Sequence, residues 1–378
     1  MTEVQVTIIG GGIVGCATAA ACAHLGWSTV LLEMDPSLGA GTTSRNSEVS
    51  HGGMYYPTGS LKARCCVEGR RLLKEFCETA GVGYRECGKL IVAVAPDETG
   101  ELERLFDLGT ANGVEDLRLV DGAELRRLEP EIRATAGLFS PRTGVLDAEG
   151  AARAYARLAE SKGCQVMTGA RVTGLDCHNG QWQVTVSPTA GRRAEGWRHN
   201  SAVVVNAAGL FADEVAALAG VDIAARGWHQ TRVKGNYFAI DPVHHHRIRH
   251  LVYPVPPADG SSLGIHVCLD LGGQLRLGPD LDLEAGPTLD YAVTEARRDV
   301  FFEDARGYLP WLRRGDLSPG LVGFRPKLKL DGFHDFVVER ETGDLAGLIN
   351  LVGIDSPGLT SSPALAGEVA RLAADSLS

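Results

Sequence analysis

The strongest constraint on this chain is a glycine pattern close to its N-terminus. Residues 10–15 read Gly-Gly-Gly-Ile-Val-Gly and match the pattern G-x-G-x-x-G. An apolar run over 4–9 precedes the glycines, an alanine-rich stretch over 13–25 follows them, and a second apolar run over 28–32 ends at Glu33. This order predicts a β-α-β unit that carries a dinucleotide-binding fingerprint.

Each position of the fingerprint has a physical role. Gly10 permits the tight turn, Gly12 lets the backbone approach a pyrophosphate, and Gly15 lets the helix pack closely on the strand. The N-terminus of the helix offers unpaired N–H groups and a positive dipole end to the anion. Glu33 would accept hydrogen bonds from a ribose, and its charge would disfavour a 2′-phosphate. The pattern therefore predicts a bound NAD or FAD.

Three turns rich in small residues favour FAD over NAD. The first is the long loop over 37–59, the second follows a strand at 202–209, and the third covers 354–362 and leads into a closing helix over 362–377. Loops of this length are usually functional, and small residues expose the backbone to a ligand. Three such turns spread along the chain suit a long ligand that lies extended.

Composition and charge narrow the classes of partner. The 378 residues are 44% hydrophobic, and the formal net charge of −10 opposes binding to a nucleic acid. No apolar run reaches the roughly 20 residues that span a bilayer, and the N-terminus has no basic region of a secretory signal. The nine cysteines show no CxxC spacing, which is typical of reduced thiols. We therefore expect a cytoplasmic protein.

Further segments along the whole chain resemble one flavoprotein superfamily. With the fingerprint they are similar to the D-amino-acid-oxidase-like FAD-dependent oxidoreductases, and within these to the L-2-hydroxyglutarate dehydrogenases and oxidases. The segments that carry the resemblance are Thr43-Ser-Arg-Asn-Ser-Glu-Val-Ser-His-Gly-Gly-Met-Tyr-Tyr-Pro57, Ser60-Leu-Lys-Ala-Arg64, Asn206-Ala-Ala-Gly209, Tyr253-Pro-Val-Pro256, Gly264-Ile-His266, Leu277-Gly-Pro279, Gly323-Phe-Arg-Pro326 and Gly353-Ile-Asp-Ser-Pro-Gly-Leu-Thr-Ser-Ser362.

The resemblance implies an α/β fold with two lobes that interleave along the chain. One is a Rossmann-like FAD-binding lobe, and the other is a substrate lobe built on an antiparallel sheet. We expect residues 1–83, 145–225 and 320–378 in the FAD-binding lobe. Residues 84–144 and 226–319 are expected in the substrate lobe.

The resemblance also implies a reaction. An L-2-hydroxy acid, L-2-hydroxyglutarate in the first place, would be oxidised to its 2-oxo acid by hydride transfer from Cα to the flavin. The electrons would pass to a quinone, another carrier or oxygen, and a weak peripheral contact with a membrane stays open. The alternative is oxidation of an α-amino acid or secondary amine, as in amino-acid, glycine and sarcosine oxidases. A non-catalytic flavin-binding module is disfavoured by the carboxylate-clamp motif.

The resemblance assigns Arg325, in Gly-Phe-Arg-Pro, to the substrate carboxylate, and a guanidinium matches a carboxylate in two hydrogen bonds. His51 and His266 are rival candidates for the base that removes the hydroxyl proton. Further substrate contacts are expected from Tyr55 and Tyr253, and a cation for a second carboxylate from Lys234, with Lys327 as another candidate.

The expected cofactor-binding residues come from the fingerprint, the long loop, the second strand pair and the two later turns. No metal site is expected, because three consecutive histidines at 244–246 do not face one way on any regular element. The cofactor set is Gly10, Gly12, Ile13, Val14, Gly15, Glu33, Thr43, Ser44, Arg45, Asn46, Val172, Ala207, Gly209, Asp355, Ser356, Gly358, Leu359 and Thr360.

Overall fold

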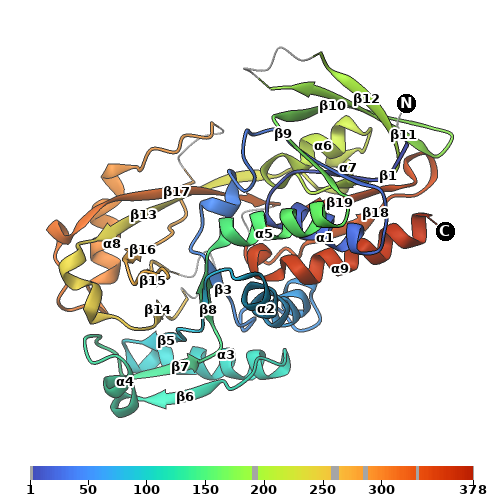
Figure 1. Ribbon diagram of the computed structural model, residues 1–378. Coiled ribbons are helices and arrows are strands. Elements are labelled where there is room, and N and C mark those ends of the chain that lie inside the picture. Colours follow the sequence, from blue (N-terminus) through green and yellow to red (C-terminus); the bar gives the residue numbers. More distant parts are fainter. Residues whose placement is uncertain (1–2, 190–194, 257–263, 284–287, 329–331, 378) are drawn as a thin grey trace.

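Two large sheets organise the computed structural model, which describes residues 3–189, 195–256, 264–283, 288–328 and 332–377. Figure 1 shows the sheet that contains β1 at the upper right and the sheet that contains β5 at the lower left. A small sheet lies between them and joins β3 (Val49–Ser50), β8 (Gly144–Leu146) and β4 (Tyr84–Arg85). The fold is mixed α/β, as predicted.

The first sheet has a parallel centre. Its order is β10-β11-β12-β1-β2-β9, β19 pairs with β12, and β18 pairs with β19. The strands β9, β2, β1, β12 and β19 run parallel to one another. The bounds are β1 (Glu3–Ile9), β2 (Thr29–Glu33), β9 (Gln165–Thr168), β10 (Ala170–His178), β11 (Gln181–Pro188), β12 (Trp197–Asn206), β18 (Val337–Arg340) and β19 (Leu348–Val352).

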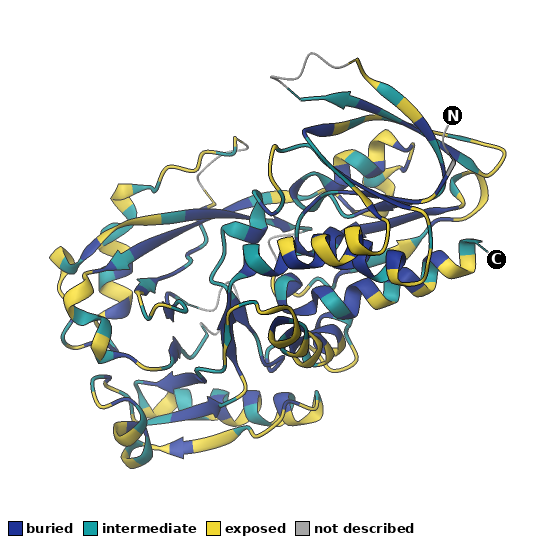
Figure 2. Cartoon of the chain, viewed as in Figure 1, coloured by how far each residue is buried: buried dark blue, intermediate teal, exposed yellow. Residues whose placement is uncertain are grey.

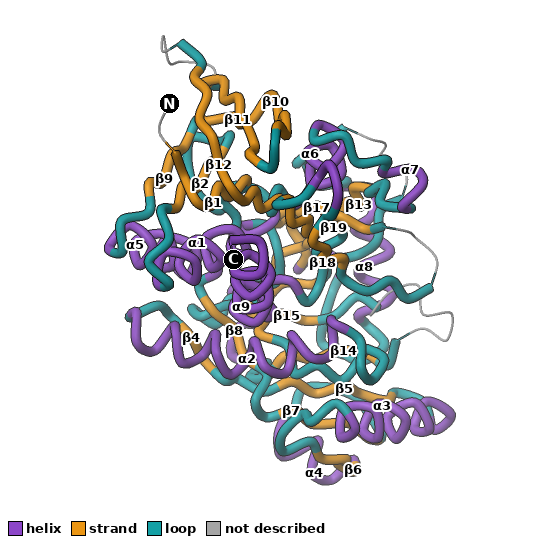
Figure 3. The backbone as a smooth tube through the Cα atoms, turned by 90° about the vertical axis from the view of Figure 1, so that its right-hand side faces the viewer, coloured by secondary structure: helices purple, strands orange, loops and turns teal. Residues whose placement is uncertain are grey.

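Helices cover both faces of this sheet, as parallel strands require. On one face Ile8 packs beneath α1 (Ile13–His24), α5 (Ala148–Ser161) and α9 (Gly358–Leu377), and α2 (Leu61–Ala80) packs on α9. Figure 3 shows these four helices grouped together beside the first sheet. The other face carries α6 (Ala212–Leu218) and, after it, the short α7 (Ile223–Arg226). The strands that these helices cover are buried through their centres (Figure 2).

The second sheet has the order β17-β13-β16-β15-β14-β5-β7-β6. Its described neighbours pair antiparallel except β5 and β14, which are parallel. The predicted antiparallel sheet is therefore corrected to a mixed one, because no hairpin links these two distant segments. The bounds are β5 (Lys89–Ala93), β6 (Arg118–Asp121), β7 (Ala136–Ser140), β13 (Thr231–Ile240), β14 (Leu251–Pro254), β15 (Val267–Leu269), β16 (Leu275–Leu277) and β17 (Leu317–Lys327), with helices α3 (Thr99–Ala111), α4 (Gly122–Leu128) and α8 (Arg298–Ala305).

The chain passes between the sheets several times. Residues 3–33, 165–206 and 337–352 supply the first sheet, and residues 89–140 and 231–327 supply the second. The predicted boundary at residue 320 lies inside β17, which is one continuous strand of the second sheet. The division into two lobes at the expected boundaries stays a prediction.

The closing helix begins earlier than the sequence suggested. α9 starts at Gly358, four residues before the expected start at Ser362, although it contains Pro363. Proline has no N–H to donate to the carbonyl of Leu359. The hydroxyl of Ser362 donates to that carbonyl instead, at 2.9 Å. The residues expected in a late turn therefore include the first turn of a helix. Among all described helices, none is both long and apolar enough to cross a bilayer.

Candidate active site

An extended cavity of about 1290 Å³ runs from the β1–α1 turn to the second sheet. Most of the predicted cofactor and substrate residues line it. Gly15, Ser44, Thr360 and Lys234 are not among its lining residues. The lining set contains Gly10, Gly12, Ile13, Val14, Glu33, Thr43, Arg45, Asn46, His51, Tyr55, Val172, Ala207, Gly209, Tyr253, His266, Arg325, Asp355, Ser356, Gly358 and Leu359.

The fingerprint glycines are required by close backbone packing. Gly10 has a φ of 110°, and a Cβ there would lie 2.4 Å from the carbonyl oxygen of Ala207. A Cβ on Gly15 would lie 1.9 Å from the carbonyl oxygen of Gly10, so only glycine lets α1 begin this close to β1. Gly12 differs from both, because its added Cβ would meet only the Thr43 hydroxyl, at 3.3 Å. The start of α1 is therefore open to a ligand at Gly12.

Glu33 binds the backbone of the turn between β1 and α1 from the end of β2. Its Oε2 accepts a hydrogen bond from the N–H of Gly11 at 2.5 Å, and its Oε1 accepts from the N–H of Asp35 at 2.7 Å. Burial raises the pKa of Glu33, and the backbone N–H donors of Asp35 and Gly11 act in the opposite direction. The carboxylate lies at the end of β2 and lines the cavity, where a ribose hydroxyl would meet it.

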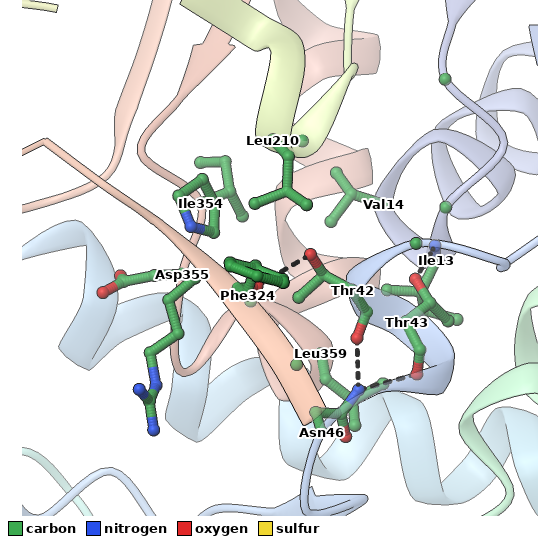
Figure 4. A pocket seen from close by; sticks show the side chains of 18 of the residues that line it. Ile13, Val14, Thr42, Thr43, Asn46, Leu210, Phe324, Ile354, Asp355 and Leu359 are labelled. Carbon is green, nitrogen blue, oxygen red and sulfur yellow. Dashed lines mark hydrogen bonds between the residues drawn. The ribbon is translucent and has the colours of Figure 1, made fainter. Parts of the chain in front are cut away.

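The loop after β2 is fixed between α1 and the second sheet, as Figure 4 shows. The Thr43 hydroxyl accepts from the N–H of Ile13 at 3.0 Å, and the Thr42 hydroxyl donates to the carbonyl of Phe324 at 3.1 Å. The Asn46 amide donates to the carbonyls of Thr42 and Thr43 at 2.9 and 2.7 Å. Asn46 and Thr43 thus hold the backbone of this loop in place with their side chains, and both residues line the cavity.

The first turn of α9 forms the wall at the far end of this loop. Lys62 Nζ lies 2.7 Å from Asp355 Oδ1, which ties α2 to the segment before α9. The Thr360 hydroxyl accepts from the N–H of His51 at 2.9 Å and donates to the carbonyl of Val49 at 3.2 Å. Thr360 therefore holds β3 and the residue after it, His51, while Gly358 and Leu359 line the cavity.

Two histidines and two tyrosines meet at the second-sheet end of the cavity. The ring of His266 stacks on that of Tyr253, with centroids 3.7 Å apart and planes 17° apart. His266 Nδ1 lies 2.9 Å from the carbonyl oxygen of Gly264. Because a carbonyl only accepts, Nδ1 carries the proton and Nε2 keeps its lone pair. The Nδ1 of His51 and the hydroxyl of Tyr55 are buried without a hydrogen-bond partner among the described residues.

Both imidazoles are neutral at physiological pH. Burial lowers the pKa of His51 well below its usual range, and the nearby Lys89 and His266 lower it further. Burial also lowers the pKa of His266 to about 3, and the carbonyl of Gly264 only partly opposes this. A neutral imidazole can accept a proton, so the pair meets the first requirement of a general base.

Arg325 enters the cavity from β17. A Cβ on Gly235, in the adjacent β13, would lie 3.1 Å from Nη1 of Arg325, so glycine makes room for the guanidinium. Nη1 donates to the carbonyl of Asp280 at 3.0 Å. Tyr237 also lines the cavity, and its hydroxyl is 3.0 Å from that of Ser47. Sequence reasoning missed Tyr237, although the strand period from Gly235 predicts that it shares a face with Gly235.

The two lysines expected near a second carboxylate lie in different places. Lys234 is buried away from the cavity, and its Nζ is 3.4 Å from Asp290 Oδ2. Lys327 lines the cavity on β17, two residues after Arg325. Burial lowers the pKa of Lys327, Arg325 and Lys62 also lower it, and Asp355 opposes them. The cavity therefore receives Lys327 and not Lys234.

Lys89 is a second residue that sequence reasoning missed. It begins β5, its side chain is fully buried, and its Nζ lies 4.2 Å from the ring centroid of Tyr253 and 4.8 Å from that of Tyr55. The available signal was one lysine at the head of the apolar run Lys-Leu-Ile-Val-Ala. The histidine run at 244–246 lies in a 3-10 helix over Pro242–Arg247.

The family model described as DAO, FAD dependent oxidoreductase, matches residues 5–372. A mitochondrial L-2-hydroxyglutarate dehydrogenase of Arabidopsis thaliana is 35% identical over 405 residues, which cover 98% of this chain and 83% of that protein. The mitochondrial L-2-hydroxyglutarate dehydrogenase of Homo sapiens is 30% identical, with 97% of this chain and 88% of that protein covered. These relatives match the chain almost throughout.

Solved structures show the same fold. The dithionite-reduced L-α-glycerophosphate oxidase of Mycoplasma pneumoniae with FAD bound superposes with a TM-score of 0.87 and 26% identity. That superposition covers 99% of this chain and 95% of the oxidase. The L-proline dehydrogenase of P. horikoshii superposes with a TM-score of 0.79 at 19% identity, covering 98% of this chain and 93% of that one. The second likeness concerns the fold alone.

Proposed function

This chain belongs to the DAO family of FAD-dependent oxidoreductases, and we propose that it oxidises L-2-hydroxyglutarate to 2-oxoglutarate. The observation that carries the proposal is the meeting of Arg325 with two neutral histidines, His51 and His266, at one end of the cavity. A carboxylate clamp beside a proton acceptor suits a 2-hydroxy acid. The relatives named L-2-hydroxyglutarate dehydrogenase support this particular acid.

FAD is the cofactor, and the residues present fit it. The open backbone at Gly12 and the N-terminus of α1 would hold the pyrophosphate, and Glu33 would hold the ribose of the adenosine. Gly358 and Leu359, in the first turn of α9, would lie beside the ring system, where a helix N-terminus stabilises negative charge. When bound, the flavin supplies the hydride acceptor.

The side chains at the second-sheet end would then bind and orient the substrate. Arg325 would take the carboxylate next to the hydroxyl-bearing carbon in two parallel hydrogen bonds. The hydroxyl proton would pass to the His51–His266 pair as the hydride leaves Cα, and the lone pair on Nε2 of His266 is set for this by its bond to Gly264. We assign the role of base to the pair.

A second cation supports a diacid over a monoacid. Arg325 and Lys327 stand two residues apart on β17, which corresponds to roughly 6.6 Å along a strand, and both line the cavity. Each would bind one carboxylate of a substrate such as 2-hydroxyglutarate. Lys327 replaces Lys234 in this role, because the side chain of Lys234 lies against Asp290.

Substrate specificity tests the proposal. Turnover of the FAD-loaded enzyme would be measured with an artificial electron acceptor and with L-2-hydroxyglutarate, its D-enantiomer, L-lactate, L-malate, glycine, sarcosine and L-proline. We expect the highest kcat/KM with L-2-hydroxyglutarate and a lower value with L-lactate, which lacks the second carboxylate. Higher kcat/KM with an amine would contradict the proposal and favour the amine-oxidase alternative, which needs no base for a hydroxyl proton.

A further inference from the structure

Lys89 is a buried cation with no ion-pair partner in the part of the chain that the structure describes. Its side chain has no exposed surface, and its Nζ has no hydrogen-bond partner among the described residues. The ammonium lies against the rings of Tyr253 and Tyr55. Stacking on aromatic faces compensates only part of the cost of taking an ammonium out of water. Burial of the charged Lys89 side chain therefore lowers the free energy of unfolding.

The strand context fixes this position. Lys89 pairs with Ser140 of β7 on one side and with Leu251 of β14 on the other, in the interior of the second sheet. The four residues that follow it in β5 are all buried and apolar. The backbone is held on both sides, and the ammonium is buried against the rings of Tyr55 and Tyr253, which line the cavity.

The groups that face Lys89 carry no negative charge at neutral pH. Cys66, Cys87 and Cys268 are its thiol neighbours, and burial raises the pKa of each thiol, to about 12 for Cys66 and about 11 for Cys87. The phenols of Tyr55 and Tyr253 are neutral as well, since burial raises the pKa of both.

His51 and His266, whose imidazoles interact electrostatically with Lys89, are also neutral. The positive charge of Lys89 contributes to the lowered pKa of His51 and of His266, and Arg325 adds to the effect on His266. Arg325 and Lys327 line the cavity, and Lys89 lies behind the rings of Tyr55 and Tyr253, which also line it. The described groups that face Lys89 supply no anion, so an anionic ligand in the cavity would be stabilised by the charge of Lys89 as well as by that of Arg325.

We propose that Lys89 is a positioning residue whose charge is balanced by the substrate carboxylate, so that anion binding and protonation of Lys89 are coupled through the Tyr55 and Tyr253 layer. The identity of the anion rests on the proposed function, but the coupling requires only a carboxylate in the cavity. The role differs from that of Arg325, which would touch the carboxylate directly.

The coupling has a measurable consequence. Burial lowers the pKa of Lys89 to about 8, and a bound carboxylate would raise it again towards its ordinary value of 10.5. Between these values binding requires uptake of a proton, so Kd rises towards tenfold per pH unit above pH 8. At pH 8 the free enzyme is half protonated at Lys89, and binding takes up about half a proton per site.

The test uses the FAD-loaded enzyme and glutarate, a dicarboxylate without a hydroxyl to oxidise. Its Kd would be followed by flavin difference absorbance from pH 6 to 10. We expect weaker binding above pH 8 in the wild type. In Lys89→Met the dependence around pH 8 disappears, and Kd at pH 7 rises about tenfold or more. Lys89→Arg, whose charge does not titrate, restores tight binding and removes the step at pH 8.

Control variants separate Lys89 from other lysines. Lys162→Met, at an exposed position after α5, keeps the wild-type Kd and pH dependence. Lys327→Gln weakens binding but keeps the step near pH 8. A step that persists in Lys89→Met and is lost in Lys327→Gln would overturn the proposal, because the coupled proton would then belong to Lys327.

A wild-type measurement keeps the proposal testable if Lys89 variants fail to fold. Glutarate binding at pH 8 in weak buffer should take up about half a proton per site, and at pH 6 almost none. Equal uptake at both pH values, or none at pH 8, would overturn the proposal. Failure of the proposed function has a different signature, namely a flavin that glutarate perturbs but L-2-hydroxyglutarate does not reduce.

Discussion

Replacing Lys89 by methionine should stabilise the fold and weaken the binding of the dicarboxylate. Methionine has a similar length and fills the same buried space without a charge. The pKa of Lys89 falls from 10.5 to about 8, and each unit corresponds to 1.36 kcal/mol. The buried ammonium therefore costs about 3 kcal/mol of folding free energy. That cost is fully present below pH 8 and fades as pH rises to 10.5, because the neutral amine carries no desolvation penalty.

Thermal unfolding at saturating FAD would measure this gain. For a chain of this length, about 3 kcal/mol corresponds to a rise in Tm of about 4 °C at pH 7. The difference between Lys89→Met and the wild type should shrink when both are unfolded at pH 10. Lys162→Met serves as the matched control and should leave Tm unchanged at either pH. A Lys89→Met variant that is less stable than the wild type at pH 7, or whose advantage is the same at pH 10, would show that the ammonium of Lys89 carries no such folding cost.

The other predictions concern the cofactor and substrate ends of the cavity. Arg325→Met should lower kcat/KM for L-2-hydroxyglutarate by at least about 100-fold, since it removes a charged partner of the carboxylate, with flavin content per chain unchanged; retained activity would contradict the clamp. At least one of the variants His51→Gln and His266→Gln should reduce its flavin about 100-fold or more slowly than the wild type, measured by stopped-flow absorbance. Near-normal rates in both variants would show that neither histidine is the base. Gly15→Val should give a protein without bound flavin, measured by absorbance after purification, because a Cβ there would lie 1.9 Å from a carbonyl oxygen; a fully loaded protein would refute this. Lys327→Ala should raise KM for L-2-hydroxyglutarate about tenfold and leave KM for L-lactate nearly unchanged. Equal effects on the two KM values would show that Lys327 does not bind the second carboxylate.

The β-α-β unit that carries the glycine fingerprint was predictable from the sequence because its contacts are local. The fingerprint from Gly10 to Gly15, the strand before it and Glu33 lie within one β-α-β unit, so their spacing alone fixes their geometry. The start of α9 was misplaced for an equally local reason. Pro363 is normally a helix breaker, and the hydroxyl of Ser362 that replaces its missing hydrogen bond was not recognised.

The substrate end depends on strand register, which the sequence does not specify. Lys234 and Gly235 are neighbours, yet only Gly235 faces the cavity, and a shift of one residue would exchange them. Lys89 was not predicted as a site residue because the rings it packs against come from distant segments, Tyr55 in the long loop and Tyr253 in β14. The parallel pairing of β5 with β14 was missed for the same reason.

If this FAD-dependent enzyme takes a hydride from an L-2-hydroxy acid, the substrate must reduce the bound flavin. We would follow this reduction by an anaerobic absorbance titration of the FAD-loaded protein with L-2-hydroxyglutarate. We expect the yellow flavin band to bleach with about one equivalent of the L-enantiomer and to stay oxidised with the D-enantiomer. A yellow protein that stays oxidised with the L-enantiomer, and bleaches with an amino acid or an N-methyl amine, would contradict hydride transfer from a 2-hydroxy acid.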